Sequence, residues 1–103
     1  VVAWLARSRP GRAYLGIQLR EVEIPPARAA GLLVAGLRRN GPAERAGLLP
    51  GDVLLAMDGA PLRGGEALGG LLAARRGGEI AVFDVLRPGG VQRLEVVLAV
   101  AED

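Results

Sequence analysis

Glycine and proline interrupt this chain so often that short strands are favoured over long helices. The 103 residues include 16 glycines and 7 prolines, and both residue types mark turns and the ends of elements. Half of the residues are hydrophobic, which is enough for a chain of this length to bury one small core. The sequence therefore predicts a single α+β domain built mainly from short strands.

The side-chain chemistry of the chain excludes most catalytic devices. It has no Cys, His, Lys or Thr, and its one serine is Ser8. Nucleophilic triads, lysine Schiff bases, disulfides and zinc sites with nitrogen or sulfur ligands all require residues of these types. We therefore expect no catalytic residue, no metal site, no cofactor and no enzymatic activity in this chain itself.

The charge pattern argues against nucleic acid and membrane partners. The 13 basic residues, all Arg, nearly balance 11 acidic ones, and only 3% of residues are aromatic, whereas nucleic-acid surfaces combine basic clusters with stacking rings. The pair Arg38–Arg39 is predicted to be a solvated loop end, or else a contact for a neighbouring domain. The apolar runs are much shorter than the roughly 20 residues of a membrane span, and Val1–Ala6 lacks the basic leader of a signal peptide.

Hydrophobic periodicity predicts five strands and two helices. Leu15, Ile17 and Leu19 alternate with Gly16, Gln18 and Arg20, the pattern of a half-buried strand that carries an unusual glycine. Asp52 is expected to cap the turn before the third strand. The strands are expected at Tyr14–Val22, Leu32–Leu37, Val53–Met57, Ile80–Arg87 and Val91–Val100, and the helices at Pro42–Ala46 and Glu66–Arg75.

The beginning of the chain differs from the rest in composition. An apolar segment, Val1–Ala6, is followed by a polar segment with a Pro-Gly turn, Arg7–Arg12. We expect residues 1–11 to be the tail of a preceding domain and a linker, residues 12–100 to be the domain, and residues 101–103 to be a C-terminal tail. The alternative is that Trp4 and Leu5 cover the core of this domain.

Two segments carry a specific resemblance. Residues 12–17 read RAYLGI, and residues 40–59 read NGPAERAGLLPGDVLLAMDG. Together they resemble a PDZ domain, and in particular the type that follows the protease domain in bacterial HtrA/Deg serine proteases. The resemblance covers about residues 12–100. It implies a bent antiparallel sheet of five to six strands, or a partly open barrel, capped by two helices.

The resemblance also implies a peptide-binding site. PDZ domains add an extended peptide as an extra strand, and backbone N–H groups beside a glycine hold its terminal carboxylate. In this chain the loop would consist of Arg12, Tyr14, Leu15, Gly16 and Ile17, with Leu15 at the rim of the pocket, Arg12 reinforcing the carboxylate and Tyr14 mainly packing.

The remainder of the implied groove lies between a strand and the longer helix. Its residues would be Ile17, Gln18, Leu19, Gly65, Gly69 and Leu72. The two glycines leave room for bulky apolar terminal residues. The helix lacks an initial His, so ligands with Ser or Thr two positions before the end are disfavoured.

The function implied is that of a substrate-docking or regulatory module for peptides and the C-termini of unfolded proteins. Its parent would be a trypsin-like serine endopeptidase of the bacterial periplasm, a homo-oligomer of the trimer type, with the protease domain as a partner. One alternative is another host, such as a membrane metalloprotease, a C-terminal-processing protease or a secretion protein. The other is a structural or oligomerisation domain with a closed groove and no peptide ligand, which a helix leaning on the Tyr14–Leu19 strand and filling the pocket would support.

Overall fold

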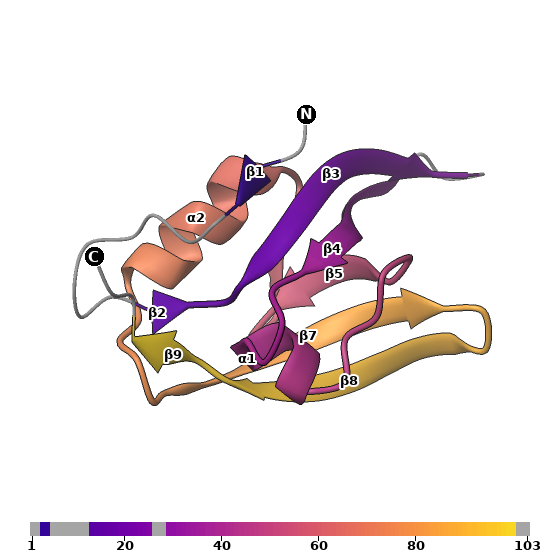
Figure 1. The fold of residues 1–103 in the computed structure, drawn as a ribbon. Coiled ribbons are helices and arrows are strands. Elements are labelled where there is room, and N and C mark those ends of the chain that lie inside the picture. The colour runs from indigo at the N-terminus through magenta and orange to yellow at the C-terminus, as the bar shows by residue number, and fades with distance from the viewer. Residues whose placement is uncertain (1–2, 5–12, 26–28, 101–103) are drawn as a thin grey trace.

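The computed structural model describes residues 3–4, 13–25 and 29–100, which form one bent antiparallel sheet, a small second sheet and two helices (Figure 1). The main sheet has the strand order β1-β3-β4-β5-β7-β8, with β6 paired to β5. Its strands are β1 (Ala3–Trp4), β3 (Ile17–Ile24), β4 (Ala29–Leu37), β5 (Val53–Met57), β6 (Ala60–Pro61), β7 (Ile80–Arg87) and β8 (Gly90–Val97).

The second sheet joins the two ends of the domain. It consists of β2 (Ala13–Tyr14) and β9 (Ala99–Val100). The expected α+β class is confirmed, and the main sheet is open rather than closed into a barrel. Three of the expected strands have other bounds: β3 runs from Ile17 to Ile24, β4 begins at Ala29 rather than Leu32, and the expected strand Val91–Val100 is divided into β8 and β9. β3 and β4 stay paired as far as Ile24 and Ala29.

The two helices close the sheet against the core. α1 (Pro42–Arg45) begins with a proline, which needs no N–H partner there. α2 (Gly65–Ala73) buries Leu68 and Leu72, as the helical spacing predicts. Among the residues whose burial the structure describes, the largest fully buried side chain is that of Phe83 on β7, and Leu15 and Ile17 are fully buried in the same cluster. The longer helix has nine residues and cannot cross a membrane.

A buried ion pair ties the turn after α1 to β7. Asp52, only 6% exposed, accepts hydrogen bonds from the Leu49 N–H at 2.9 Å and from Nε and Nη2 of Arg87 at 3.0 and 2.7 Å. Arg87 Nη2 also donates to the Gly47 carbonyl at 2.7 Å. Burial alone would raise the pKa of Asp52, but these hydrogen bonds outweigh it and hold that pKa below its ordinary value. The carboxylate therefore stays charged and keeps the turn in place.

Candidate functional site

The chain turns sharply at Gly16, between β2 and β3. Gly16 has φ +71°, a backbone conformation that glycine adopts far more readily than other residues. The alternation of residues 15–20 predicts one continuous strand, but the structure splits it here, because Tyr14 pairs with Ala99 while Ile17 pairs with Leu37 in another sheet.

The backbone around Gly16 is held by its carbonyl groups. The Leu15 carbonyl accepts the Ala43 N–H at 3.1 Å, and the Gly16 carbonyl accepts the Arg38 N–H at 3.0 Å. Within the described residues, the N–H groups of Leu15 and Gly16 donate to no acceptor. Two adjacent N–H donors without an intramolecular acceptor, beside a positive φ, form the kind of concavity that binds an anion.

The side chains of the loop are less exposed than we expected. Leu15, placed at the rim by the sequence analysis, is fully buried in the core, so only its backbone can face a ligand. The cause is the turn at Gly16, which directs the Leu15 side chain inward. Ile17 is also fully buried and Leu19 is 5% exposed, so both support the β3 strand from below. Arg12 lies outside the described residues.

The outer edge of β3 carries a short strand of the chain's own. β1 pairs antiparallel with β3, with Ala3 opposite Leu19 and Trp4 opposite Gln18. The expectation that this edge is unpaired is therefore wrong at Gln18 and Leu19. The partner is a segment that we had assigned to the preceding domain and linker. On the other side of β3, a register shift at the same two residues bends the pairing with β4.

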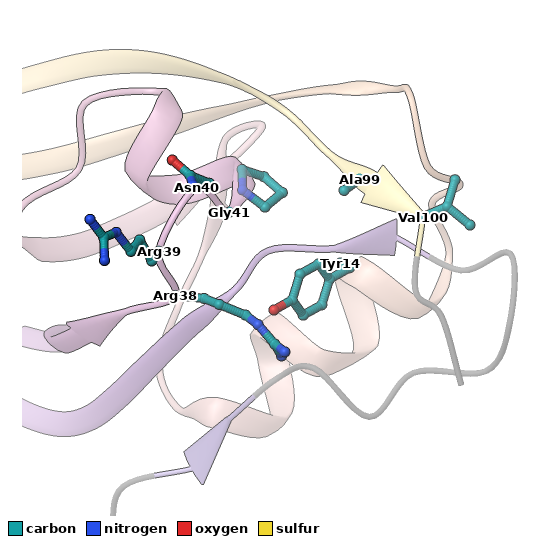
Figure 2. A pocket seen from close by; sticks show the side chains of 8 residues that line it. Tyr14, Arg38, Arg39, Asn40, Gly41, Ala99 and Val100 are labelled. Carbon is teal, nitrogen blue, oxygen red and sulfur yellow. The ribbon is translucent and has the colours of Figure 1, made fainter.

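Helix α2 lies on the β1 side of β3 in both views (Figures 1 and 2). A side chain links the two elements: the Gly65 N–H donates to Glu21 Oε2 at 2.9 Å, and a carboxylate at a helix N-terminus is electrostatically favourable. A Cβ added at Gly65 would lie 3.8 Å from the same oxygen, so the flank of α2 bearing Gly65 turns toward β3. Gly69, one turn later on that flank, has open space around the position of a Cβ atom. Leu72 is 3% exposed and belongs to the core.

Sequence reasoning missed the position of Arg38. Its guanidinium carbon lies 5.8 Å from the centroid of the Tyr14 ring, a cation–π distance, and its Cβ lies 3.3 Å from where a Cβ of residue 16 would be. Figure 2 shows Arg38 extending past the Tyr14 hydroxyl while Arg39 points away. The pairing of Ile17 with Leu37 brings Arg38 to the loop, and only knowledge of that register could have identified it.

A cavity of about 300 Å³ adjoins this pair of side chains. The buried Tyr14 hydroxyl has no hydrogen-bond partner within the described part of the chain. The loop therefore combines two unpaired N–H groups, a positive charge and a phenol within a few residues. The lining residues are Tyr14, Arg38, Arg39, Asn40, Gly41, Pro42, Ala99 and Val100.

The chain matches the family model of the PDZ domain over residues 13–98. A probable periplasmic serine endoprotease, DegP-like, of Ectopseudomonas mendocina is 37% identical over 93 residues, which are 84% of this chain and 20% of that protein. The magnetosome formation protease MamE of Paramagnetospirillum magneticum is 39% identical over 67 residues, which are 65% of this chain and 9% of that protein. The chain thus spans about a fifth or less of the length of these relatives.

Solved structures give the same match. The HtrA-type protease AlgW with a decapeptide is 33% identical, with a TM-score of 0.76, over 89% of this chain and 30% of that one. The HtrA3 PDZ domain bound to the phage-derived ligand FGRWV has a TM-score of 0.74 at 20% identity, over 86% of each chain. At that identity the second likeness concerns the fold alone.

Proposed function

The chain belongs to the PDZ domain family, and on that premise we propose that it binds hydrophobic peptides by adding them as a strand to the outer edge of β3. It is a binding module, and we propose that it serves as the docking domain of an HtrA-type serine endopeptidase in the bacterial periplasm. The DegP-like relatives support this host, since they are named as probable periplasmic serine endoproteases.

The observation that carries the proposal is the strand pairing at Gln18 and Leu19. β1 adds there in antiparallel orientation, so this edge has the geometry that strand addition requires. Main-chain hydrogen bonds contribute about 1 kcal/mol each, and one buried apolar side chain adds about 1.5–3 kcal/mol. After the cost of ordering a free peptide, an affinity of about micromolar strength is expected.

The loop at Gly16 supplies the place for a terminal carboxylate. The free N–H groups of Leu15 and Gly16 would donate to it, and Arg38 would add a positive charge nearby. A peptide that ends opposite Ile17 would run toward this loop along β3. The proposed ligand is therefore a chain end with an apolar last residue.

We expect a hydrophobic-ended peptide with a free carboxylate to bind about fivefold to tenfold more tightly than its amidated form, because the charged acceptor makes the stronger hydrogen bonds. The measurement is a titration followed by the amide signals of Leu15–Leu19. In the Arg38→Gln variant the ratio of acid to amide affinity should fall. The matched Arg39→Gln variant loses an equal charge from a side chain that points away from Tyr14. In this variant the ratio of acid to amide affinity should stay unchanged.

The closed groove remains the competing function, and the pairing of β1 with β3 is the observation that favours it. A broad peptide library that moves none of the Leu15–Leu19 signals would establish a structural domain and overturn peptide binding. Equal affinity for acid and amide would show instead that internal segments, rather than chain ends, are the ligands.

Gly69 and Gly70 offer a matched pair of substitutions on α2. Neither position has a heavy atom within 4 Å of an added Cβ, so Gly69→Leu and Gly70→Leu should each stabilise the helix by about 1 kcal/mol. Gly69 lies on the Glu21 side of the helix, whereas Gly70 is exposed. We expect Gly69→Leu to weaken peptide binding about fivefold or more by filling the groove, and Gly70→Leu to leave it unchanged. Equal affinities, measured by calorimetry on folded variants, would place the groove elsewhere.

A further inference from the structure

The strand β1 has three properties of a bound peptide. It pairs with β3 at Gln18 and Leu19, on the edge opposite to β4. It runs antiparallel to β3, so its residue numbers increase toward the loop at Gly16. It lies on the side of β3 where α2 stands (Figure 1).

Its register coincides with the register of the proposed ligand. A peptide whose last residue stands opposite Ile17 would place its penultimate residue opposite Gln18 and the one before it opposite Leu19. Trp4 and Ala3 take these two places. A strand edge has one set of N–H and C=O groups, so both chains cannot pair with it at once.

We propose that the Ala3–Trp4 strand is a built-in occupant of the peptide site, which an incoming peptide must displace. The inference rests on the function proposed above and adds a second, competing occupant. In the free chain, β1 covers the edge of β3 at Gln18 and Leu19. In the complex, the same edge is taken over by the peptide.

The β1 strand is short enough for a peptide to displace it. Two paired residues form few hydrogen bonds with β3, so the hold is weak. The segment is nevertheless tethered through residues 5–12 to β2 and competes at the high effective concentration of an intramolecular ligand. If β1 holds the edge for about 70–90% of the time, the apparent affinity for peptide falls about threefold to tenfold.

The first test compares the binding of one hydrophobic-ended peptide by three forms of this 103-residue chain. The variant carrying both Ala3→Pro and Trp4→Pro lacks the two N–H groups and cannot form the strand. We expect it to bind the peptide about threefold to tenfold more tightly than the original chain. The control carries Ala3→Val and Trp4→Tyr, which keep both N–H groups and favour strands. It should bind the peptide no more tightly than the original chain.

The second test needs no substitution and follows hydrogen exchange in the original chain. N–H groups alternate in direction along an antiparallel strand, so one of the two β1 amides, Ala3 or Trp4, faces β3. Saturating peptide should speed the exchange of that amide, because its strand is displaced. Of the Gln18 and Leu19 amides, the one that faces the β1 edge should keep its protection, because the peptide replaces β1 as its partner.

The outcomes separate the two proposals. If all three forms bind the peptide equally, or if the β1 amide that faces β3 is as protected with peptide as without it, the proposal of a built-in occupant is wrong and peptide binding stands. If the proline variant is folded and still binds no peptide of a broad library, the peptide-binding function is wrong, and the proposal of a built-in occupant is then wrong as well. If the proline variant binds the peptide more tightly than the original chain and the Val/Tyr control does not, the result supports both the peptide-binding function and the built-in occupant.

Discussion

Valine at position 16 is expected to reduce peptide affinity more than tenfold. Gly16 has φ +71°, where a β-branched residue is strained by about 1–3 kcal/mol. Its Cβ would stand 3.3 Å from both Arg38 Cβ and Tyr14 Oη, so the loop must shift to accept it. A shift of the loop turns the Leu15 and Gly16 N–H groups away from the peptide carboxylate. Calorimetric titration of the Gly16→Val variant with a hydrophobic-ended peptide measures the loss.

A matched substitution separates this effect from general strain. Gly51 has φ +96° and no heavy atom near an added Cβ, and it lies in the turn before Asp52 rather than at the groove. Gly51→Val should lower the free energy of unfolding by a comparable 1–3 kcal/mol, roughly, and leave peptide affinity unchanged. A folded Gly16→Val variant that binds peptide as the original does would remove the loop from the binding site.

Loss of the Asp52 charge is expected to lower the free energy of unfolding by about 1–3 kcal/mol, because Asp52→Asn leaves the partly buried Arg87 without its carboxylate. The carboxamide cannot accept the pair of hydrogen bonds from Arg87. Urea unfolding at neutral pH measures the difference. The control is Asp84→Asn, since Asp84 pairs with Arg93, whose side chain is 79% exposed, and such pairs contribute little. Equal losses in the two variants would contradict a special role for Asp52.

The same pair predicts a pH dependence. The pKa of Asp52 is lower in the folded chain than its ordinary value, so its contribution to stability is present above about pH 4. It is lost as the pH falls through the folded-state pKa, when the carboxylate is protonated. The difference in unfolding free energy between the original chain and Asp52→Asn should therefore shrink on acidification.

Much of the fold could be predicted because local sequence signals agree with it. The apolar run at Val53–Met57 is β5 with the predicted bounds, and the leucines of Glu66–Arg75 form a helix. The start of β4 was missed because Ala29 and Ala30 are small and exposed and carry no strand pattern. Their pairing with β3 holds them in the strand, and pairing with a distant segment is not encoded in local periodicity.

The candidate site, like the fold, could be predicted only in part. Gly16 could be identified from its unusual place in a strand, since its backbone role is local. The occupant of the β3 edge could not, because the apolar segment Val1–Ala6 fits a preceding domain as well as this one. The structure places Ala3 and Trp4 against the sheet edge by backbone pairing, which apolar composition alone does not predict.

The covered edge of β3 also bears on how copies of this chain behave toward one another. A bare strand edge pairs with any other edge it meets, which leads to sheets that grow from molecule to molecule. A short strand that is easily displaced would prevent such growth. It would give way only to a partner that forms more hydrogen bonds with β3 than two paired residues do. That arrangement would keep the β3 edge available to a peptide while limiting edge-to-edge pairing between copies of this chain.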